Sequence, residues 1–275
     1  MADHQQVWYV YGVVTATPPF AHAPTGLDEA SIESLSDTDL AAVASRLDGG
    51  DYAPAAVERG TADMEWLAPR AVAHDRVLTW ASDRGPVVPF PMFSLFSNEV
   101  AVRAMLQERR LELQRALRRA SEGREYALRV YRLDDELRTV AAELSPRLAE
   151  LEHAAAAASP GQRYLIERKL DTERKTELRA IGARVGREIL EGLRTLAVDA
   201  FSSPLAPRAS VGAGTVENPL VLDAAFLIAP AELEAFQKAL AAIVGRHGSR
   251  GFRFDFTGPW PPYHFVQSVD RGNEA

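Results

Sequence analysis

The sequence predicts an α+β protein built from two domains, and three observations lead to this prediction. The chain has 275 residues, 47% of them hydrophobic, so it can bury more than one core of ordinary size. Short β-branched and aromatic runs alternate with longer amphipathic segments, as strands and helices do in α+β proteins. Gly123 separates two such series, which places the domains at 1–123 and 124–275.

The first domain begins with a strand and ends with a helix. Residues 7–14, VWYVYGVV, are typical of a strand buried on both faces. The segments SIESL and DLAAVASRL predict two further strands, although the second segment is equally compatible with a helical turn. A helical pattern follows at 62–83, where Pro69 is expected to break the helix or start a new one. A second helix is expected from Asn98, a good N-cap residue, to Ser121.

Residues 87–93, VVPFPMF, lie between these helices and form an apolar, extended segment. Pro89 and Pro91 lack a backbone donor, so the segment is expected at a sheet edge or unpaired. Large apolar side chains in such a place are candidates for contact with a partner. The candidates here are Phe90, Met92 and Phe93.

The second domain has the predicted element order β-α-β-β-α-β, which is the order of a ferredoxin-like domain. Its first helix is expanded into a helical hairpin over about 134–201, with a break at Ser159 and Pro160. The expected strands are EYALRVYRL, RASVGA, NPLVLDAAFLIA and FRFDFTG, with a helix over 230–248. This order predicts a four-stranded antiparallel sheet with its helices on one face.

The residues that usually carry catalysis form no constellation in this chain. The absence of cysteine excludes disulfides, thiolate metal sites and a cysteine nucleophile. The six histidines lack metal-binding spacing, and VGAGT at 211–215 has no lysine or following helix to bind phosphate. We therefore expect no catalytic residue, no metal and no cofactor.

Charge and hydropathy also limit the possible partners. A net charge of −7 gives no general attraction for nucleic acid or an anionic membrane. The first apolar run is too short for a signal core or a membrane span, which predicts a cytoplasmic protein. Arg115, Arg118 and Arg119 share one helix face; this face is either simply solvated or a docking patch for an acidic partner.

The tail FTGPWPPYHFV, residues 256–266, combines three prolines with several aromatic rings. The prolines stiffen the backbone, and the rings either cover the edge of a core or form a binding hot spot. The hot-spot candidates are Trp260, Tyr263 and Phe265. Both interpretations remain open at this point.

The tail resembles the gas vesicle protein L/F family, and TGPWPPY is the most discriminating part of the match. VWYVYGVV, AHDRVLTW, VVPFPMFSLFSNEVAVRAML and EYALRVYRL resemble that family in the same order, so the match runs from Val7 to Val266. The segment PFPMFSLF departs from the family, which usually has a leucine-arginine-phenylalanine-glycine type of run there. No role is carried over to an arginine or glycine at that place.

The resemblance implies a cytoplasmic accessory protein of gas vesicle formation that is not an enzyme. It implies that the partners are the small hydrophobic shell protein and other accessory proteins, and that the chain is a minor component of the shell or an assembly factor. Two other functions stay open from the residues themselves. One is a small-molecule-binding or enzymatic α+β protein, and the other is a coiled-coil scaffold built on Ile181, Val185 and Ile189.

Overall fold

The computed structural model describes residues 6–16, 20, 22–205 and 218–266, which form two compact units. One unit comprises the chain up to Glu125 together with the segment that begins at Pro259, and the other is Tyr126–Gly258. The chain thus passes between the units close to Gly123 and a second time at Pro259. The contiguous domains of the sequence analysis miss this second crossing, because the tail buries Val266 in a core of the first unit.

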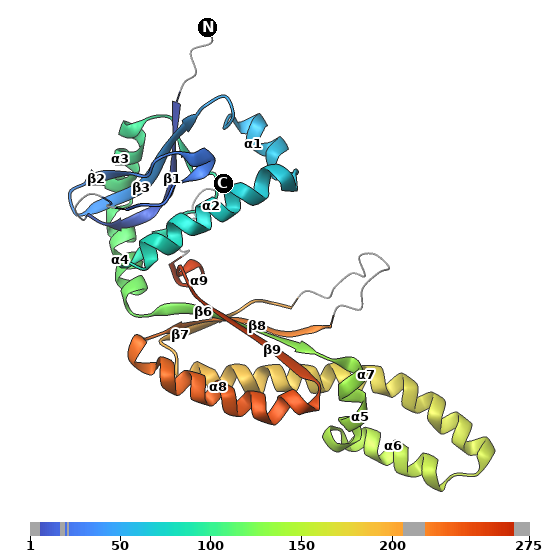
Figure 1. Ribbon diagram of the computed structural model, residues 1–275. Helices are drawn as coiled ribbons and strands as arrows, with labels where there is room; N and C mark the ends of the chain where they lie inside the picture. Colours follow the sequence, from blue (N-terminus) through green and yellow to red (C-terminus); the bar gives the residue numbers. More distant parts are fainter. Residues whose placement is uncertain (1–5, 17–19, 21, 206–217, 267–275) are drawn as a thin grey trace. The chain divides into compact units, whose positions relative to one another are not determined.

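The first unit contains a sheet of strand order β2-β3-β1-β4, with β5 also paired to β1 (Figure 1). Its strands are β1 (Gln6–Thr15), β2 (Glu33–Asp37), β3 (Leu40–Asp48), β4 (Val87–Pro89) and β5 (Leu95–Phe96). Its helices are η1 (Leu27–Glu29), α1 (Pro54–Thr61), α2 (Met64–Ser82), α3 (Glu99–Glu108), α4 (Arg110–Ser121) and α9 (Tyr263–Val266).

Strand β1 is buried on both faces, as its sequence predicts. Trp8 and Val10 belong to a core shared with α3 and α4, whereas Tyr9 and Tyr11 belong to a second core shared with α2. The register of β1 against β3 shifts between Val10 and Gly12. The first unit is therefore a sheet with helices packed on both of its faces.

Two helical predictions for this unit need correction. Pro69 lies inside α2 without ending it. The proline removes a helical hydrogen bond, and the burial of Val77 and Leu78 of the same helix in a core offsets that cost. The predicted helix from Asn98 to Ser121 is divided at Arg109, whose φ and ψ of −99° and 12° are not helical. Its start is as predicted, since the Asn98 side chain accepts a hydrogen bond from the Ala101 N–H at 2.9 Å.

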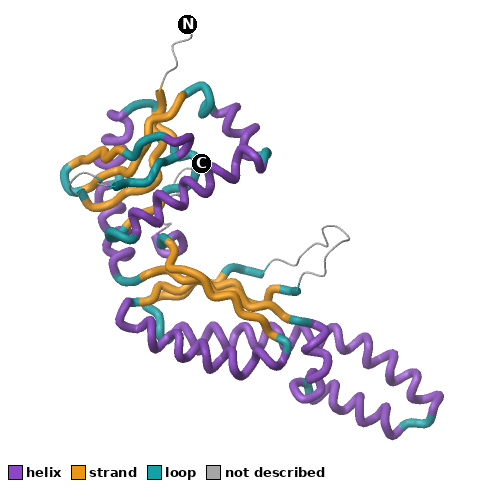
Figure 2. The backbone as a smooth tube through the Cα atoms, viewed as in Figure 1, coloured by secondary structure: helices purple, strands orange, loops and turns teal. Residues whose placement is uncertain are grey.

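The second unit contains a four-stranded sheet of order β7-β8-β6-β9. Its strands are β6 (Arg124–Arg132), β7 (Asp199–Ser202), β8 (Leu220–Ile228) and β9 (Phe252–Trp260). Its helices are α5 (Asp134–Leu144), α6 (Pro146–Ala157), α7 (Pro160–Arg194), η2 (Pro230–Glu232), α8 (Leu233–His247) and η3 (Gly248–Arg250). Figure 2 shows α7 and α8 along one face of this sheet. The α+β class is confirmed.

The second strand of this unit is not where the sequence analysis places it. The predicted strand RASVGA, at 208–213, and the turn at Gly214 lie outside the described residues. The strand that pairs with β8 is Asp199–Ser202, which the analysis assigns to the helical region 134–201. Helix α7 ends earlier, at Arg194, and the predicted break at Ser159 and Pro160 is present.

Helix α7 packs against its own sheet. Ile181, Val185 and Ile189 are at most 4% exposed and belong to the core of the second unit. The apolar stripe considered as a coiled-coil seam is therefore covered within the chain. Gly186 permits this packing, because a Cβ there would lie 2.4 Å from the Val221 carbonyl oxygen.

Candidate partner-binding surfaces

A buried polar network holds the segment that follows β4. The Tyr9 hydroxyl lies 2.7 Å from His74 Nδ1, and it accepts a hydrogen bond from the Phe93 N–H at 3.3 Å. Burial lowers the pKa of His74 to about 4, against the smaller opposing effect of a hydrogen bond to the Phe90 backbone. His74 is therefore neutral at pH 7. Through the Tyr9 hydroxyl it holds a turn in which Phe93 has a φ of 64°.

The three apolar candidates in this segment differ in exposure. Phe90 is only 4% exposed and lies in the core beneath α3 and α4, so it is not available to a partner. This position corrects the expectation of a surface contact. The Phe90 N–H donates to the Tyr11 carbonyl at 2.9 Å, which continues the pairing with β1 past β4 and holds the ring against the core. Met92 and Phe93 are half-buried, and Phe93 stacks on Trp66 at a centroid distance of 5.4 Å.

The arginines of α4 lie on its solvent side, opposite the buried residues Leu113 and Leu117. Arg115 and Arg118 are exposed, whereas Arg119 is half-buried and paired with Glu122. Leu111, one turn before Arg115, is 68% exposed. The outer face of α4 therefore presents one apolar side chain beside two cations.

Most of the tail, residues 259–266, packs against the first unit, and we call this packed segment the clasp. Gly258, with a φ of 128°, allows the chain to turn; Pro261 and Pro262 are buried, and α9 packs against α4. Tyr263 is half-buried, and burial raises its pKa. Phe265 is also half-buried, whereas Trp260 is 37% exposed. Of the predicted hot-spot residues, Trp260 is the most available to a partner.

Glu125 anchors this clasp. Its carboxylate is 2% exposed. One oxygen accepts a hydrogen bond from the His264 backbone N–H at 2.9 Å, and the other lies 2.6 Å from His264 Nδ1. In the sequence Glu125 is recognisable only as the start of a strand, since a pair 139 residues apart leaves no local pattern.

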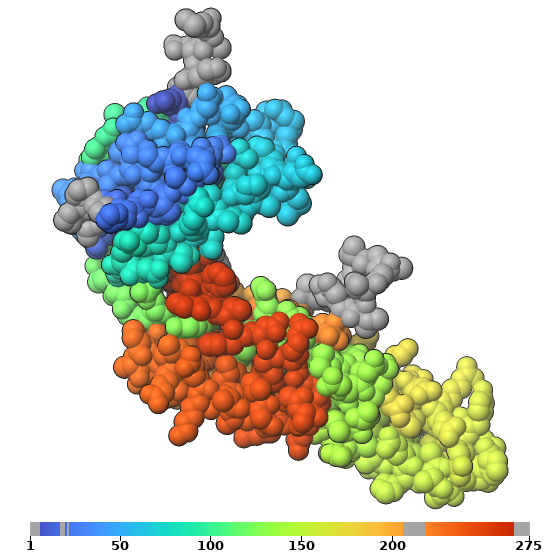
Figure 3. All heavy atoms as spheres, viewed as in Figure 1, coloured from blue at the N-terminus to red at the C-terminus, as the bar shows by residue number. Residues whose placement is uncertain are grey.

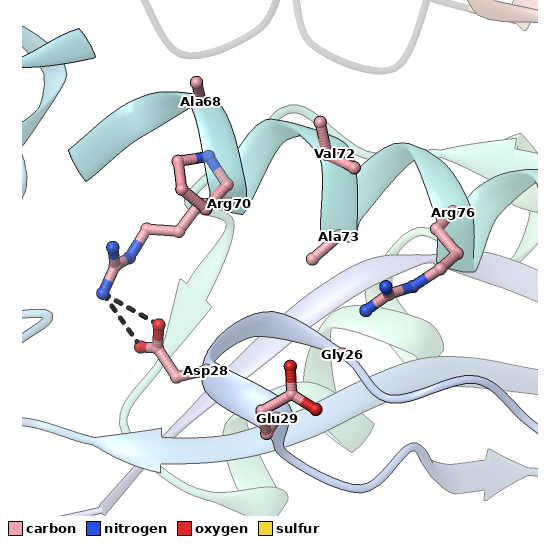
Figure 4. Close-up of a pocket in the computed structure, with 9 residues that line it drawn as sticks. Gly26, Asp28, Glu29, Ala68, Arg70, Val72, Ala73 and Arg76 are labelled. Atoms are coloured by element: carbon pink, nitrogen blue, oxygen red, sulfur yellow. Dashed lines mark hydrogen bonds and ion pairs between the residues drawn. The ribbon is translucent and has the colours of Figure 1, made fainter. Parts of the chain in front are cut away.

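A groove between η1 and α2 is the site that the sequence analysis misses (Figure 4). It has a volume of about 500 Å³. Asp28 on one wall pairs with Arg70 on the other at 2.8 Å and accepts a hydrogen bond from the Tyr52 hydroxyl at 2.5 Å. Asp28 and Glu29 both have positive φ, which non-glycine residues rarely adopt. These contacts with α2 and Tyr52 hold the loop in that conformation.

The α2 wall of this groove continues into an apolar stripe. Met64 and Val72 are 68% and 65% exposed, and Ala68 lies between them at the i+4 position. Their spacing is visible in the sequence, but the expected break at Pro69 hides the fact that one helix carries all three. The groove and α4 lie on opposite faces of the first sheet, because α2 and α4 belong to different cores.

Two kinds of site are not found in the part of the chain that the structure describes. No group of three or more histidine, aspartate or glutamate side chains is arranged to hold a metal ion. No helix among the described residues is long and apolar enough to cross a membrane.

Comparison with known proteins decides the family. Residues 7–267 match the family described as "Gas vesicle synthesis protein GvpL/GvpF". The chain belongs to this GvpL/GvpF family. It is 27% identical over 264 residues to "Gas vesicle protein L" of Streptomyces sp. (strain CB03234), covering 94% of this chain and 92% of that protein.

Solved structures of GvpF proteins share the fold. The crystal structure of GvpF from Anabaena sp. PCC7120 aligns with a TM-score of 0.65 at 17% identity, over 95% of this chain and 96% of that one. GvpF from Microcystis aeruginosa aligns with the same score and identity, over 95% and 99%. A GvpL/GvpF protein has a role in gas vesicle assembly, associates with other gas vesicle proteins and is not of a known enzyme family.

Proposed function

We propose that this chain binds the small hydrophobic shell protein of the gas vesicle and holds it in solution until it is added to the growing shell. The observation that carries this proposal is the exposed apolar stripe of Met64, Ala68 and Val72 beside the groove of η1. A helix with such a stripe provides one wall of a groove that accepts the apolar face of a partner helix. A bound subunit is thereby kept from aggregating.

The charged residues around the groove set the orientation of the bound segment in this proposal. Asp28 and Glu29 line one wall, and Arg70 and Arg76 line the other. Since Asp28 and Arg70 are already paired, the carboxylate of Glu29 and the guanidinium of Arg76 are the groups that a partner meets. Arg76 also donates a hydrogen bond to the Thr25 carbonyl at 2.7 Å, which holds its guanidinium at this wall.

A second contact surface is proposed on α4 and the tail. Arg115 and Arg118 attract an acidic accessory protein or an acidic part of the shell protein, and Arg119 contributes less because it is paired with Glu122. Trp260 provides the aromatic contact there, with Met92, Tyr263 and Phe265 as half-buried support. Phe93 stacks on Trp66 of α2 and so contributes on the α2 side instead. In this proposal the protein acts in the cytoplasm and at the vesicle.

We infer that the second unit is a ferredoxin-like domain. Its elements follow the order β-α-β-β-α-β with the first helix replaced by α5, α6 and α7, and its strand order β7-β8-β6-β9 places the first and third strands at the centre. In the proposed function this unit takes no part in the groove, whose lining residues all belong to the first unit.

Co-expression with the shell protein of the same organism tests the proposal. The tagged chain should elute with soluble shell protein, which aggregates when it is expressed alone. Val72→Lys and Met64→Lys place a charge in the stripe without disturbing a core, so both should abolish co-elution. Tyr164→Lys is the matched control, because Tyr164 is 63% exposed on α7 of the other unit. If the stripe variants co-elute as well as the control does, the groove is not the binding site.

A further inference from the structure

Strand β9 has an open edge. It lies at one end of the second sheet, so only one of its edges pairs with a described strand, β6. No proline occurs between Phe252 and Gly258, so every residue there has a backbone donor. On the face drawn in Figure 3, the atoms of β9, in red, lie at the surface.

The edges of the first sheet are blocked by comparison. At one edge, Pro89 ends β4 and Pro91 follows, and both lack a backbone donor. At the other edge, the carbonyl of Ser36 in β2 accepts a hydrogen bond from Arg103 of α3. Proteins commonly protect strand edges in these ways against pairing with another chain. Among the described residues, no proline and no side chain from another element protects 252–256 of β9 in this way.

The sequence of β9 is complementary to itself in an antiparallel arrangement. Residues 252–256 read Phe-Arg-Phe-Asp-Phe. When two copies are aligned around Phe254, Arg253 of each copy lies opposite Asp255 of the other. Phe254 then faces Phe254, and Phe252 faces Phe256. Opposite charges directly across an antiparallel pair stabilise it, as do aromatic pairs.

The faces of the strand agree with this alignment. Phe252, Phe254 and Phe256 point to the helix-covered face, where they join or pack against the core. Arg253 and Asp255 are exposed on the other face, 3.3 Å apart. Within each pair that meets across the proposed contact, the two residues thus lie on the same side of the combined sheet, as a pleated pair requires.

We propose that β9 pairs with β9 of a second copy of this chain, which joins two four-stranded sheets edge to edge around a two-fold axis at Phe254. The half-exposed rings of Phe254 and Phe256 become covered in the dimer. Each Arg253 exchanges its contact with Asp255 of its own chain for the Asp255 of the other.

The dimer should be weak and concentration-dependent. A pair of short edge strands buries less surface than a standard protein interface, which points to a dissociation constant on the order of 10 µM. Such a dimer forms only where the local concentration of the chain is comparable to this dissociation constant. The self-pairing surface belongs to the second unit and is independent of the proposed groove on α2.

Charge reversal in the full-length protein tests this pairing by sedimentation equilibrium. Arg253→Asp leaves an acidic residue at both 253 and 255, and Asp255→Arg leaves a basic residue at both. Because like charges then face each other across the pair, each variant should dimerise at least about tenfold more weakly. An equimolar mixture of the two variants restores both opposite-charge pairs and should recover dimers. The double variant Arg253→Asp with Asp255→Arg should dimerise like the wild type.

The control is Arg246→Asp on α8, which removes an exposed ion pair with Glu188 of α7 and should leave dimerisation unchanged. A second readout is hydrogen exchange, in which the amides of residues 252–257 should become more protected as the protein concentration rises. A wild type that stays monomeric up to on the order of 100 µM overturns the proposal. Single variants that dimerise like the wild type, or a mixture that stays monomeric, overturn it as well.

Discussion

The Glu125 carboxylate binds both the backbone N–H and the ring Nδ1 of His264, at 2.9 Å and 2.6 Å. Glu125 is the last residue of the first unit before the chain enters the second, and His264 follows the return of the chain at Pro259. This contact fixes the tail beside the start of β6. The tail is therefore part of the first unit although 133 residues separate Glu125 from Pro259 (residues 126–258).

Glu125→Ala should lower the free energy of unfolding by about 1–3 kcal/mol, because it leaves the His264 N–H without its buried partner. Urea denaturation followed by tryptophan fluorescence measures this change. The control is Glu108→Ala, since Glu108 is exposed on α3 and its loss should change stability by less than about 0.5 kcal/mol. Equal effects of the two substitutions would show that the clasp does not stabilise the fold.

The stability of the first unit should fall as the pH is lowered from 7 to 5. The pKa of His74 is about 4 in the folded protein and 6.5 in its ordinary state, so the unfolded chain binds the proton first. The contribution is complete above pH 6.5 and is lost as the pH falls towards 4. The loss amounts to about 2 kcal/mol at pH 5.

Denaturant midpoints at pH 7 and pH 5, compared for the wild type and His74→Gln, isolate this effect. Asp75 changes stability in the opposite sense, because burial raises its pKa, and it is present in both proteins. The variant should lose less stability between the two pH values than the wild type. If both lose the same amount, His74 is not the group responsible.

Two glycines of α7 should respond in opposite ways to alanine. Gly186→Ala places a Cβ 2.4 Å from the Val221 carbonyl oxygen and should destabilise the second unit by about 1–3 kcal/mol. Gly192→Ala meets nothing within 4 Å and should stabilise the helix by up to about 1 kcal/mol. Thermal unfolding by circular dichroism compares them, and a stable Gly186→Ala variant would contradict the close approach of α7 to β8.

Phe90→Ala should destabilise the first unit by about 3–5 kcal/mol, because it removes a ring from the core beneath α3 and α4. Leu111→Ala on α4 is the comparison, since that side chain is 68% exposed and its loss should cost less than about 0.5 kcal/mol. Chemical denaturation of both variants measures the difference. A small effect at Phe90 would restore it as a candidate for partner contact.

Much of the fold and some of the surface could be predicted from local pattern. The β-branched and aromatic run at 7–14 predicts β1, and Asn98 predicts the start of α3, because both depend on neighbouring residues. The helical spacing of Arg115, Arg118 and Arg119 likewise predicts that they share one face of α4. The strand at Asp199–Ser202 was assigned to a helix because four residues are too few to show a period.

The sequence by itself determined the α+β class, most strand and helix positions, the absence of cysteine chemistry and, through the tail motif, the family. Only the tertiary structure decided that Phe90 is core, that the tail returns to the first unit through Glu125 and His264, and that η1 and α2 form a groove. These features depend on contacts between residues far apart in the chain. Local periodicity carries no information about which distant segment covers a given side chain.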